Sequence, residues 1–345
     1  MFKDLLIRPA IWAGLLGAAA LLPGFRVPAP APRSRTFVLR STATVPVPPA
    51  GTHTLDLWLP LPHADASQDV RKLQIESPVP YKIEKGAYGN QMLHLRPATV
   101  PTAPLVVRLT AQITRREHLN LAAGDPAAAA KSAKKEKPDA DMARWLAPDR
   151  LVPLDAQIRQ QAQEVVAQAG AKTDLDKARA VYEHVVGTMK YDKTGQGWGR
   201  GDIYYACDAR RGNCTDFHAV FIGYCRAVGV PARFSIGLPL PAPRGTAAAE
   251  AEIKGYHCWA EFYTSETGWV PIDASEAAKD PGRRGYFFGA HDENRVEFTR
   301  GRDVMLAPAQ AGPPLNYFVY PYAEADGKPL EVARTYVFTD VGGRK

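Results

Sequence analysis

The sequence contains few cysteines and none of the spacings that build a zinc site. Its 345 residues include four cysteines, and no two of them form a C-x-x-C pair. Because zinc sites use closely spaced Cys or His ligands, a metal site is the weaker interpretation, and we expect no metal and no cofactor. No internal repeat is evident. Hydrophobic residues make up 46% and charged residues 23% of the chain, a balance typical of globular domains rather than of disorder.

No nucleic-acid partner is expected, although the formal net charge is +7. Part of the excess lies in one run, KSAKKEK at residues 131–137, and such runs are usually solvated linkers. Neither a basic face nor a nucleic-acid-binding motif is visible. The abundance of proline (30) and glycine (28) favours short strands and turns over a helical bundle.

The apolar run at the N-terminus is too short for a typical membrane-spanning helix. It extends from Ala10 to Leu22, whereas a spanning helix needs about 20 apolar residues. The pattern is typical of a secretory signal, so we predict that residues 1–34 are a signal peptide or an N-terminal anchor with a Pro-rich spacer. Pro32 follows the small residues that would suit cleavage, so a retained anchor and a buried helix stay open. Either membrane-related interpretation predicts an exported protein, periplasmic or anchored, that meets the membrane only through this segment.

Four further segments follow from the pattern of strands, helices and breakers. Residues 35–118 hold short, partly alternating apolar segments separated by turn residues, which predicts an antiparallel β-sandwich. Residues 119–150 are charged and low in complexity, and we expect a linker. Residues 151–276 change from helical to strand-like periodicity, and residues 277–345 contain further short apolar runs, a predicted strand-rich extension. Helices followed by strands, without regular βαβ alternation, predict an α+β fold.

Cys214 is predicted to lie in the first turn of a helix. It stands near the start of RRGNCTDFHAVFIGYCRAVGVPARF (210–234), and apolar residues follow it at helical spacing until Gly229. Residues 191–213 are expected to be a loop that follows two amphipathic helices. The unpaired N–H groups and the dipole at a helix N-terminus stabilise a thiolate and can also hold an oxyanion. The alternative is that Cys214 is a small apolar residue of the core.

A predicted hairpin can bring a histidine and an aspartate together beside this cysteine. The strand GYHCWAEFY places His257 and Trp259 on one face, and WVPID follows a TSETG turn and ends at Asp273. If the hairpin is centred at Ser265, His257 lies opposite Asp273, whereas a centre one residue later makes them diagonal neighbours; both arrangements allow contact. Cys214 would be the nucleophile, His257 would stabilise the thiolate and protonate the leaving group, and Asp273 would fix the ring tautomer. The alternatives are a structural histidine and an aspartate that caps a turn.

The remaining cysteines and a second histidine are given other roles. His218 lies one turn after Cys214 and is expected to be structural. Cys225 lies eleven residues from Cys214 on the same predicted helix, and a separation of about 16 Å is too long for a disulfide. Cys207 could pair with Cys225 or Cys258, and the sequence does not decide between them.

The segments RRGNCTDFHAVFIGYCRAVGVPARFSIG, GYHCWAEFY and GWVPIDASEA, in this order, resemble the transglutaminase-like superfamily over about residues 150–276. The resemblance implies a papain-like α+β core, with the cysteine helix packed on an antiparallel sheet, and a catalytic triad of Cys214, His257 and Asp273. It also implies acyl transfer through a thioester, as transamidation, deamidation or amide hydrolysis, on a protein or peptide such as a cell-wall peptide. The N-terminal sandwich and the tail look like those of exported bacterial members.

The resemblance also points to residues around the cleft. The family often places an upstream tryptophan or polar group at the oxyanion, so Trp198 and Tyr205 are candidates here, and Trp259 is a candidate for the cleft. The C-G-[SA]-C-[WY] signature of papain proteases and the acidic loop of calcium sites are absent, so the likeness concerns the superfamily core. A non-catalytic binding or scaffold module of the cell envelope is the alternative function. The sequence does not distinguish among amide substrates, or between water and an amine as acceptor.

Overall fold

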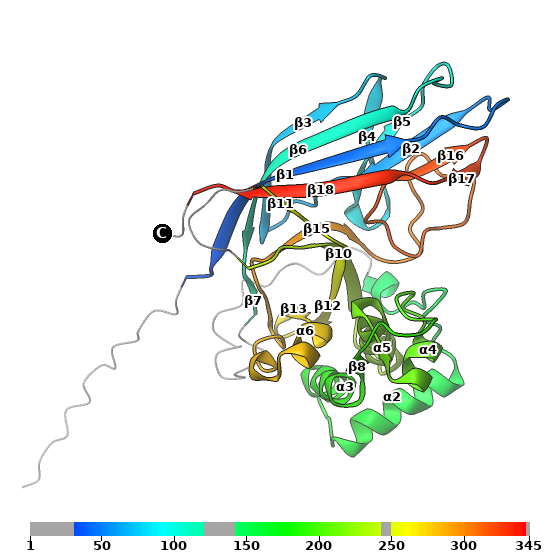
Figure 1. Ribbon diagram of the computed structural model, residues 1–345. Helices are drawn as coiled ribbons and strands as arrows, with labels where there is room; N and C mark the ends of the chain where they lie inside the picture. Colours follow the sequence, from blue (N-terminus) through cyan, green and yellow to red (C-terminus); the bar gives the residue numbers. More distant parts are fainter. Residues whose placement is uncertain (1–30, 121–141, 243–249, 343–345) are drawn as a thin grey trace, which may run out of the picture. The chain divides into compact units, whose positions relative to one another are not determined.

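Residues 31–120, 142–242 and 250–342 are described by a computed structural model, shown in Figure 1. The predicted signal peptide or anchor, up to residue 30, and most of the predicted linker lie outside the described residues. All elements discussed below belong to one unit that extends from Pro32 onward. No helix in the described part of the chain has the length and apolar character needed to cross a membrane.

Two antiparallel five-stranded sheets form a β-sandwich (Figure 1). The strand order of the first sheet is β11 (Ala251–Glu252), β18 (Ala333–Asp340), β1 (Ser34–Val45), β6 (Leu105–Arg116) and β3 (Gln68–Glu76). The strand order of the second sheet is β17 (Lys328–Leu330), β16 (Tyr322–Ala325), β2 (Leu55–Pro60), β5 (Gln91–Leu95) and β4 (Tyr81–Lys85). Each strand-like segment of residues 35–118 thus corresponds to one strand of the sandwich.

Alternating burial explains why these segments pack as a sandwich. Every second side chain of β6 is buried, and the residues between them are partly or fully exposed. The buried set is Leu105, Val107, Leu109, Ala111, Ile113 and Arg115. Because successive side chains of a strand point to opposite faces, one face of this sheet joins the core while the other meets solvent.

The C-terminal segment is integrated into both halves of the fold. β18 pairs with β1 over eight residues, and β16 pairs with β2. A third strand, β15 (Arg295–Arg300), pairs with β10 (Ala232–Pro239) in a separate four-stranded sheet. The apolar runs after residue 277 therefore complete the sandwich and the adjoining sheet rather than forming a separate layer.

The second half of the fold packs helices on a four-stranded antiparallel sheet (Figure 1). Its strand order is β13 (Gly268–Ile272), β12 (His257–Thr264), β10 and β15. The helices are α2 (Ala156–Gln168), α3 (Asp174–Thr188), α4 (Ile203–Ala209), α5 (Cys214–Ala227) and α6 (Ala274–Lys279). All residues of α5 are buried, since it lies against β12 and is surrounded by α2, α3 and α4. This arrangement confirms the predicted α+β class, with an antiparallel sandwich before a papain-like core.

Short elements complete the fold. β7 (His118–Leu119) pairs with β14 (Ala290–His291), and β8 (Lys190–Tyr191) pairs in parallel with β9 (Arg211–Gly212). The described residues also form the 3-10 helices η1 (Ala87–Gly89), η3 (Met142–Trp145) and η4 (Pro281–Arg283).

The expectation of a continuous loop over residues 191–213 was wrong, because this region contains α4. Asp202 caps the helix by accepting hydrogen bonds from the backbone N–H groups of Tyr204 and Tyr205. Because α4 has only seven residues, about two turns, its sequence is too short to show a helical periodicity of apolar residues. The part of the segment before α4 is irregular, and its glycines at 195, 197, 199 and 201 all have positive φ. We call residues 195–201 the glycine loop.

Candidate active site

Cys214 occupies the first position of α5, as the sequence predicted. Asn213 caps the helix, and its Oδ1 accepts the N–H of Thr215 at 2.9 Å. Asp216 completes a capping box by accepting the N–H of Asn213 at 2.9 Å. The sulfur therefore lies where backbone N–H groups and the positive end of the helix dipole favour a negative charge.

The hairpin of β12 and β13 brings His257 and Asp273 into contact. Ala260 pairs with Ile272, and Glu261 with Pro271, which sets the centre one residue after Ser265 and makes His257 and Asp273 diagonal neighbours. Nε2 of His257 lies 2.7 Å from Oδ2 of Asp273. The second of the two alignments allowed by the sequence is thus the one adopted.

The environment of the thiol and the imidazole favours an ion pair. Burial alone would raise the pKa of the Cys214 thiol, but side-chain interactions with Cys258 and His257, and the charge of His257, lower it well below its ordinary value. Burial alone would lower the pKa of His257, but Asp273 and then Cys214 raise it to about 10. A cysteine that readily loses its proton lies beside a histidine that retains one, which is the charge state of an activated nucleophile.

Asp273 is held by four groups. Besides His257, Arg295 donates from Nη1 to Oδ2 at 3.1 Å, while the Ser275 hydroxyl and the N–H of Glu276 donate to Oδ1 at 3.0 Å each. Burial would raise the pKa of Asp273, yet the charges of His257 and Arg295 hold it well below the ordinary value. The carboxylate therefore both orients His257 and caps α6, so the two roles weighed from the sequence coexist.

His218 is fully buried beside these residues in a neutral form. Its Nε2 accepts the N–H of Ala274 at 3.2 Å, so the ring proton lies on Nδ1. Nδ1 lies 3.6 Å from the Cys258 sulfur. Burial lowers the pKa of His218 despite the charge of Asp273. These contacts agree with the structural role that the sequence predicted for His218.

Asp216 ties the glycine loop to the start of α5. Its carboxylate accepts the N–H of Gly199 at 2.7 Å and that of Gly201 at 3.0 Å, in addition to the capping bond from Asn213. Burial raises the pKa of Asp216, and these backbone bonds oppose the rise. The loop is thereby fixed against the helix turn that carries Cys214.

The three cleft candidates occupy different surroundings. Trp198 donates its indole N–H to the carbonyl of Gly195 at 3.1 Å, and the Tyr205 ring lies under Gly197, where a Cβ would approach it to 2.8 Å. Trp198 is thus part of the glycine loop, and the Tyr205 ring packs against that loop. Trp259 is 1% exposed, and its ring centroid lies 5.9 Å from that of His257. Of the three, Trp259 is the one whose ring lies directly beside that of His257.

Sequence reasoning missed several residues around the thiol. Tyr191, Tyr256 and Tyr317 are near enough that the charge on Cys214 contributes, after burial, to raising their pKa values. The Tyr256 hydroxyl accepts from Asn213 Nδ2 at 2.9 Å and donates to the Gly199 carbonyl at 3.2 Å. The position of Tyr256 next to His257 was a usable signal. Tyr317 and Arg295 belong to the C-terminal segment, which reaches the site through long-range contacts. No local pattern in the sequence indicated their positions.

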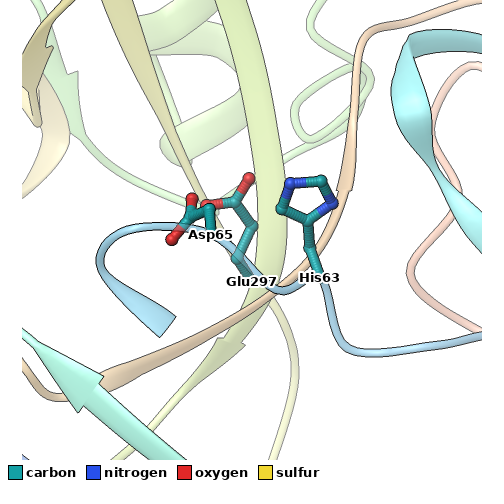
Figure 2. Close-up of side chains that lie close together, drawn as sticks. All are labelled: His63, Asp65 and Glu297. Atoms are coloured by element: carbon teal, nitrogen blue, oxygen red, sulfur yellow. The ribbon is translucent and has the colours of Figure 1, made fainter. Parts of the chain in front are cut away.

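One cluster outside this site has the residue types of a metal centre. The side chains of His63, Asp65 and Glu297, shown in Figure 2, bring ligand atoms within 4.8 Å of one another. However, Arg300 donates to Asp65 at 2.5 Å and to Glu297 at 2.6 Å, and Arg115 lies 3.8 Å from Glu297. Guanidinium cations already neutralise both carboxylates, so we interpret the cluster as buried ion pairs.

The four cysteines are free thiols. Cys207 is half-buried and its sulfur lies 3.4 Å from the Tyr224 hydroxyl, while Cys225 and Cys258 are buried. The pairings of Cys207 that the sequence left open are not formed in this structure.

Comparisons with known proteins bear on the family and the fold. Residues 159–274 match the family model of the transglutaminase-like superfamily. A Haemophilus influenzae protein described as "uncharacterized" is 28% identical over 326 residues, which cover 85% of this chain and 87% of that protein. The crystal structure of a "putative cysteine protease" from Cytophaga hutchinsonii aligns with a TM-score of 0.58 at 16% identity, over 91% of this chain and 93% of that one.

The match to the Cytophaga structure spans both halves of the chain and therefore shows a shared fold. The periplasmic domain of TgpA from Pseudomonas aeruginosa is more distant, with a TM-score of 0.35 at 15% identity over 75% of this chain and 91% of that domain. Residues 159–274 form a domain of the transglutaminase-like superfamily.

Proposed function

We propose that this protein is a cysteine-dependent enzyme that transfers an acyl group from an amide substrate through a thioester. The observation that carries the proposal is the position of Cys214 at the start of α5, beside a His257 ring that is paired with Asp273. A thiolate, an imidazolium and an orienting carboxylate are the groups that nucleophilic acyl transfer needs. The transglutaminase-like fold is compatible with these roles.

Each step is assigned to an atom of the chain. The Cys214 thiolate attacks the carbonyl carbon of the amide, and N–H groups at the start of α5 stabilise the charge that develops on the carbonyl oxygen. Because Nε2 of His257 is bonded to Asp273, Nδ1 is the ring nitrogen that faces the reaction. Its proton passes to the departing amine as the C–N bond breaks, which leaves a thioester and a neutral ring.

The second half of the reaction restores the ion pair. The neutral His257 ring takes a proton from water or from a second amine as that nucleophile attacks the thioester carbonyl. Collapse of the intermediate breaks the C–S bond and releases Cys214 as the thiolate beside a protonated ring. Water gives hydrolysis or deamidation, and an amine gives transamidation.

The proposed substrate is an amide of a protein or peptide, such as a cell-wall peptide, met by an exported, periplasmic or anchored protein. Cys214 and His257 are only 1% and 6% exposed, so a substrate must displace covering side chains to reach the sulfur. The alternative, a non-catalytic module, requires an unreactive thiol. The lowered pKa of Cys214 favours the enzyme.

A peptide library incubated with the protein and a primary amine tests the proposal. Mass spectrometry of the intact protein should detect an acyl adduct. The peptide products should show replacement of ammonia by water, cleavage of a peptide bond, or incorporation of the amine. Cys214→Ala should abolish both while leaving the circular dichroism spectrum unchanged. Cys207→Ala, which alters a half-buried thiol away from the triad, serves as the matched control and should retain both. Product formation that survives Cys214→Ala would contradict the proposal.

A further inference from the structure

Cys214 has a second thiol as a neighbour. Cys258 directly follows His257 on β12 and is fully buried. Its side chain interacts with that of Cys214, as the side chain of His257 does. The acyl-transfer mechanism assigns no step to Cys258. The presence of this buried thiol beside the Cys214 sulfur therefore needs another explanation.

The contacts of Cys258 orient it toward Cys214 as a hydrogen-bond donor. The Nδ1 proton of His218 faces the Cys258 sulfur at 3.6 Å, so this sulfur receives a hydrogen bond from the ring. Burial, and then the interaction with Cys214, raise the pKa of Cys258, so it remains protonated. A protonated Cys258 beside the Cys214 thiolate places a second sulfur next to the reactive one.

The other two thiols lack this arrangement. Cys225 lies eleven residues from Cys214 on the same helix, about 16 Å along its axis. Cys207 makes its sulfur contact with the Tyr224 hydroxyl. They serve as internal references for any reaction that depends on the neighbouring pair.

We propose that Cys214 and Cys258 form a site of reversible oxidation by hydroperoxides, in which Cys258 is the resolving thiol. The Cys214 thiolate attacks one oxygen of the peroxide, the O–O bond breaks, and Cys214 becomes a sulfenic acid while hydroxide leaves. The Cys258 sulfur then attacks the Cys214 sulfur, the S–O bond breaks, and the thiol proton leaves with the oxygen as water. The hydroxide takes the proton of the His257 imidazolium and becomes water. With hydrogen peroxide, one thiolate and one thiol are thus oxidised to a disulfide, and the peroxide is reduced to two waters.

The local charges support the second step. Cys258 is held as a thiol in part by the negative charge on Cys214, and that charge disappears when Cys214 becomes a neutral sulfenic acid. The His218 N–H that faces Cys258 then stabilises its thiolate. Formation of the disulfide would remove the nucleophile and protect Cys214 from irreversible oxidation to the sulfinic acid, and a dithiol would restore it. The inference shares with the proposed function the reactive thiolate at Cys214, on which it rests.

Treatment of the full chain with hydrogen peroxide tests the site directly. After free thiols are blocked with N-ethylmaleimide, peptide mapping by mass spectrometry should find a Cys214–Cys258 cross-linked peptide. Cys207 and Cys225 should be found blocked as free thiols. Dithiothreitol should remove the cross-link and restore blocking of Cys214. Oxidation of Cys214 to the sulfinic acid with Cys258 still blocked as a free thiol would overturn the proposal, as would an unreacted Cys214.

A variant separates the role of Cys258 from that of Cys214. Cys258→Ser should still be alkylated at Cys214, but peroxide should convert Cys214 to the sulfinic acid, which dithiothreitol does not reverse. Cys207→Ser should form the cross-link like the original chain. A Cys214–Cys258 cross-link without any acyl transfer to amide substrates would contradict the proposed function but support the proposed oxidation site. Turnover of amide substrates by a protein whose Cys258 stays reduced under peroxide would contradict the proposed oxidation site and leave the proposed function supported.

Discussion

His257 and Arg295 contact the same oxygen of Asp273. Oδ2 lies 2.7 Å from His257 Nε2 and 3.1 Å from Arg295 Nη1, and Arg295 also reaches Asp292 at 3.3 Å. The guanidinium carbon lies 4.8 Å from the ring centroid of Trp259, which in turn neighbours His257. Arg295 lies outside the segment that matches the transglutaminase-like model, so the strand-rich C-terminal segment supplies a buried cation to Asp273.

Replacing Arg295 should destabilise the fold and shift its acid sensitivity. Arg295→Met removes one of two cations from each of two buried carboxylates, because Asp273 keeps His257 and Asp292 keeps Arg283. The free energy of unfolding should therefore fall by less than the roughly 3–5 kcal/mol that a buried charge left without any partner costs. Asp273 has a lowered pKa, so its stabilising contribution is present above the ordinary carboxyl pKa and is lost as the pH falls. Without Arg295 that pKa rises, and acid unfolding should begin at a higher pH.

Urea denaturation followed over a range of pH measures both effects. Arg295→Lys, which keeps the charge but not the two-pronged contact, is the matched control and should lose less stability than Arg295→Met. Equal stability of the Met and Lys variants at neutral pH would show that the charge on residue 295 does not matter.

Local patterns in the sequence were sufficient for the helix and the hairpin of the site. The apolar spacing after Cys214 and the stop at Gly229 predicted α5, which ends at Ala227. The TSETG turn predicted the hairpin, but its centre decides whether Asp273 lies opposite or diagonal to His257, and that depends on how the turn residues pack. Side-chain identities alone left both alignments open.

The pairing of strands that are distant in the chain could not be predicted from the sequence. β15 joins the far edge of the sheet through β10, with a register shift between Ile236 and Gly237, so nothing in the spacing of Asp273 and Arg295 indicates that they touch. Likewise, β18 pairs with β1 across most of the chain length. Such contacts are fixed by the packing of whole sheets rather than by local propensity.

The alkylation rate of Cys214 should have its pH midpoint well below that of an ordinary thiol. A free cysteine has a pKa of about 8.5, whereas the environment of Cys214 lowers its pKa strongly. The rate with iodoacetamide should therefore reach its plateau at a lower pH for Cys214 than for the other thiols of the chain. Acyl transfer should fall again as the pH approaches the His257 pKa of about 10, because the proton for the leaving group is then lost.

Peptide-level mass spectrometry follows each cysteine in one experiment. Burial raises the pKa of Cys207, so its alkylation should increase only in alkaline solution and provides the internal reference. His257→Gln should move the Cys214 midpoint upward, since the imidazolium is gone. Identical pH profiles for Cys214 and Cys207 would refute an activated thiolate.

The ion pair should also give stability a maximum at intermediate pH. His257 has a pKa raised from 6.5 to about 10, so its contribution is full below 6.5 and is lost as the pH rises through about 10. Cys214 has a pKa lowered from 9.0, so its contribution is full above 9.0 and is lost as the pH falls. The two slopes cancel between 6.5 and 9.0, and the pair stabilises most in that window.

A double-mutant cycle of Cys214→Ser and His257→Gln isolates this term. The coupling energy is obtained from urea denaturation in the presence of a reductant, and it should be greatest between about pH 6.5 and 9.0. Outside this window it should decline by up to about 1.36 kcal/mol for each pH unit over which one partner loses its charge. A coupling energy that does not vary with pH would mean that the two side chains are both neutral in the fold.

Gly199 should control the reactivity of Cys214, and Gly229 offers a control with the same backbone conformation. The φ angles are +85° at Gly199 and +84° at Gly229, so alanine at either position costs about 1–2 kcal/mol in the left-handed region. A Cβ at Gly199 would lie 3.3 Å from Asn213 Nδ2 and 3.7 Å from the Tyr256 hydroxyl, whereas at Gly229 it would meet nothing within 4 Å. Both variants should therefore lose similar stability in urea, but only Gly199→Ala should disturb the cap of α5 and slow iodoacetamide alkylation of Cys214. Equal alkylation rates in the two variants, at equal stability, would mean that the glycine loop does not set the geometry of the helix start.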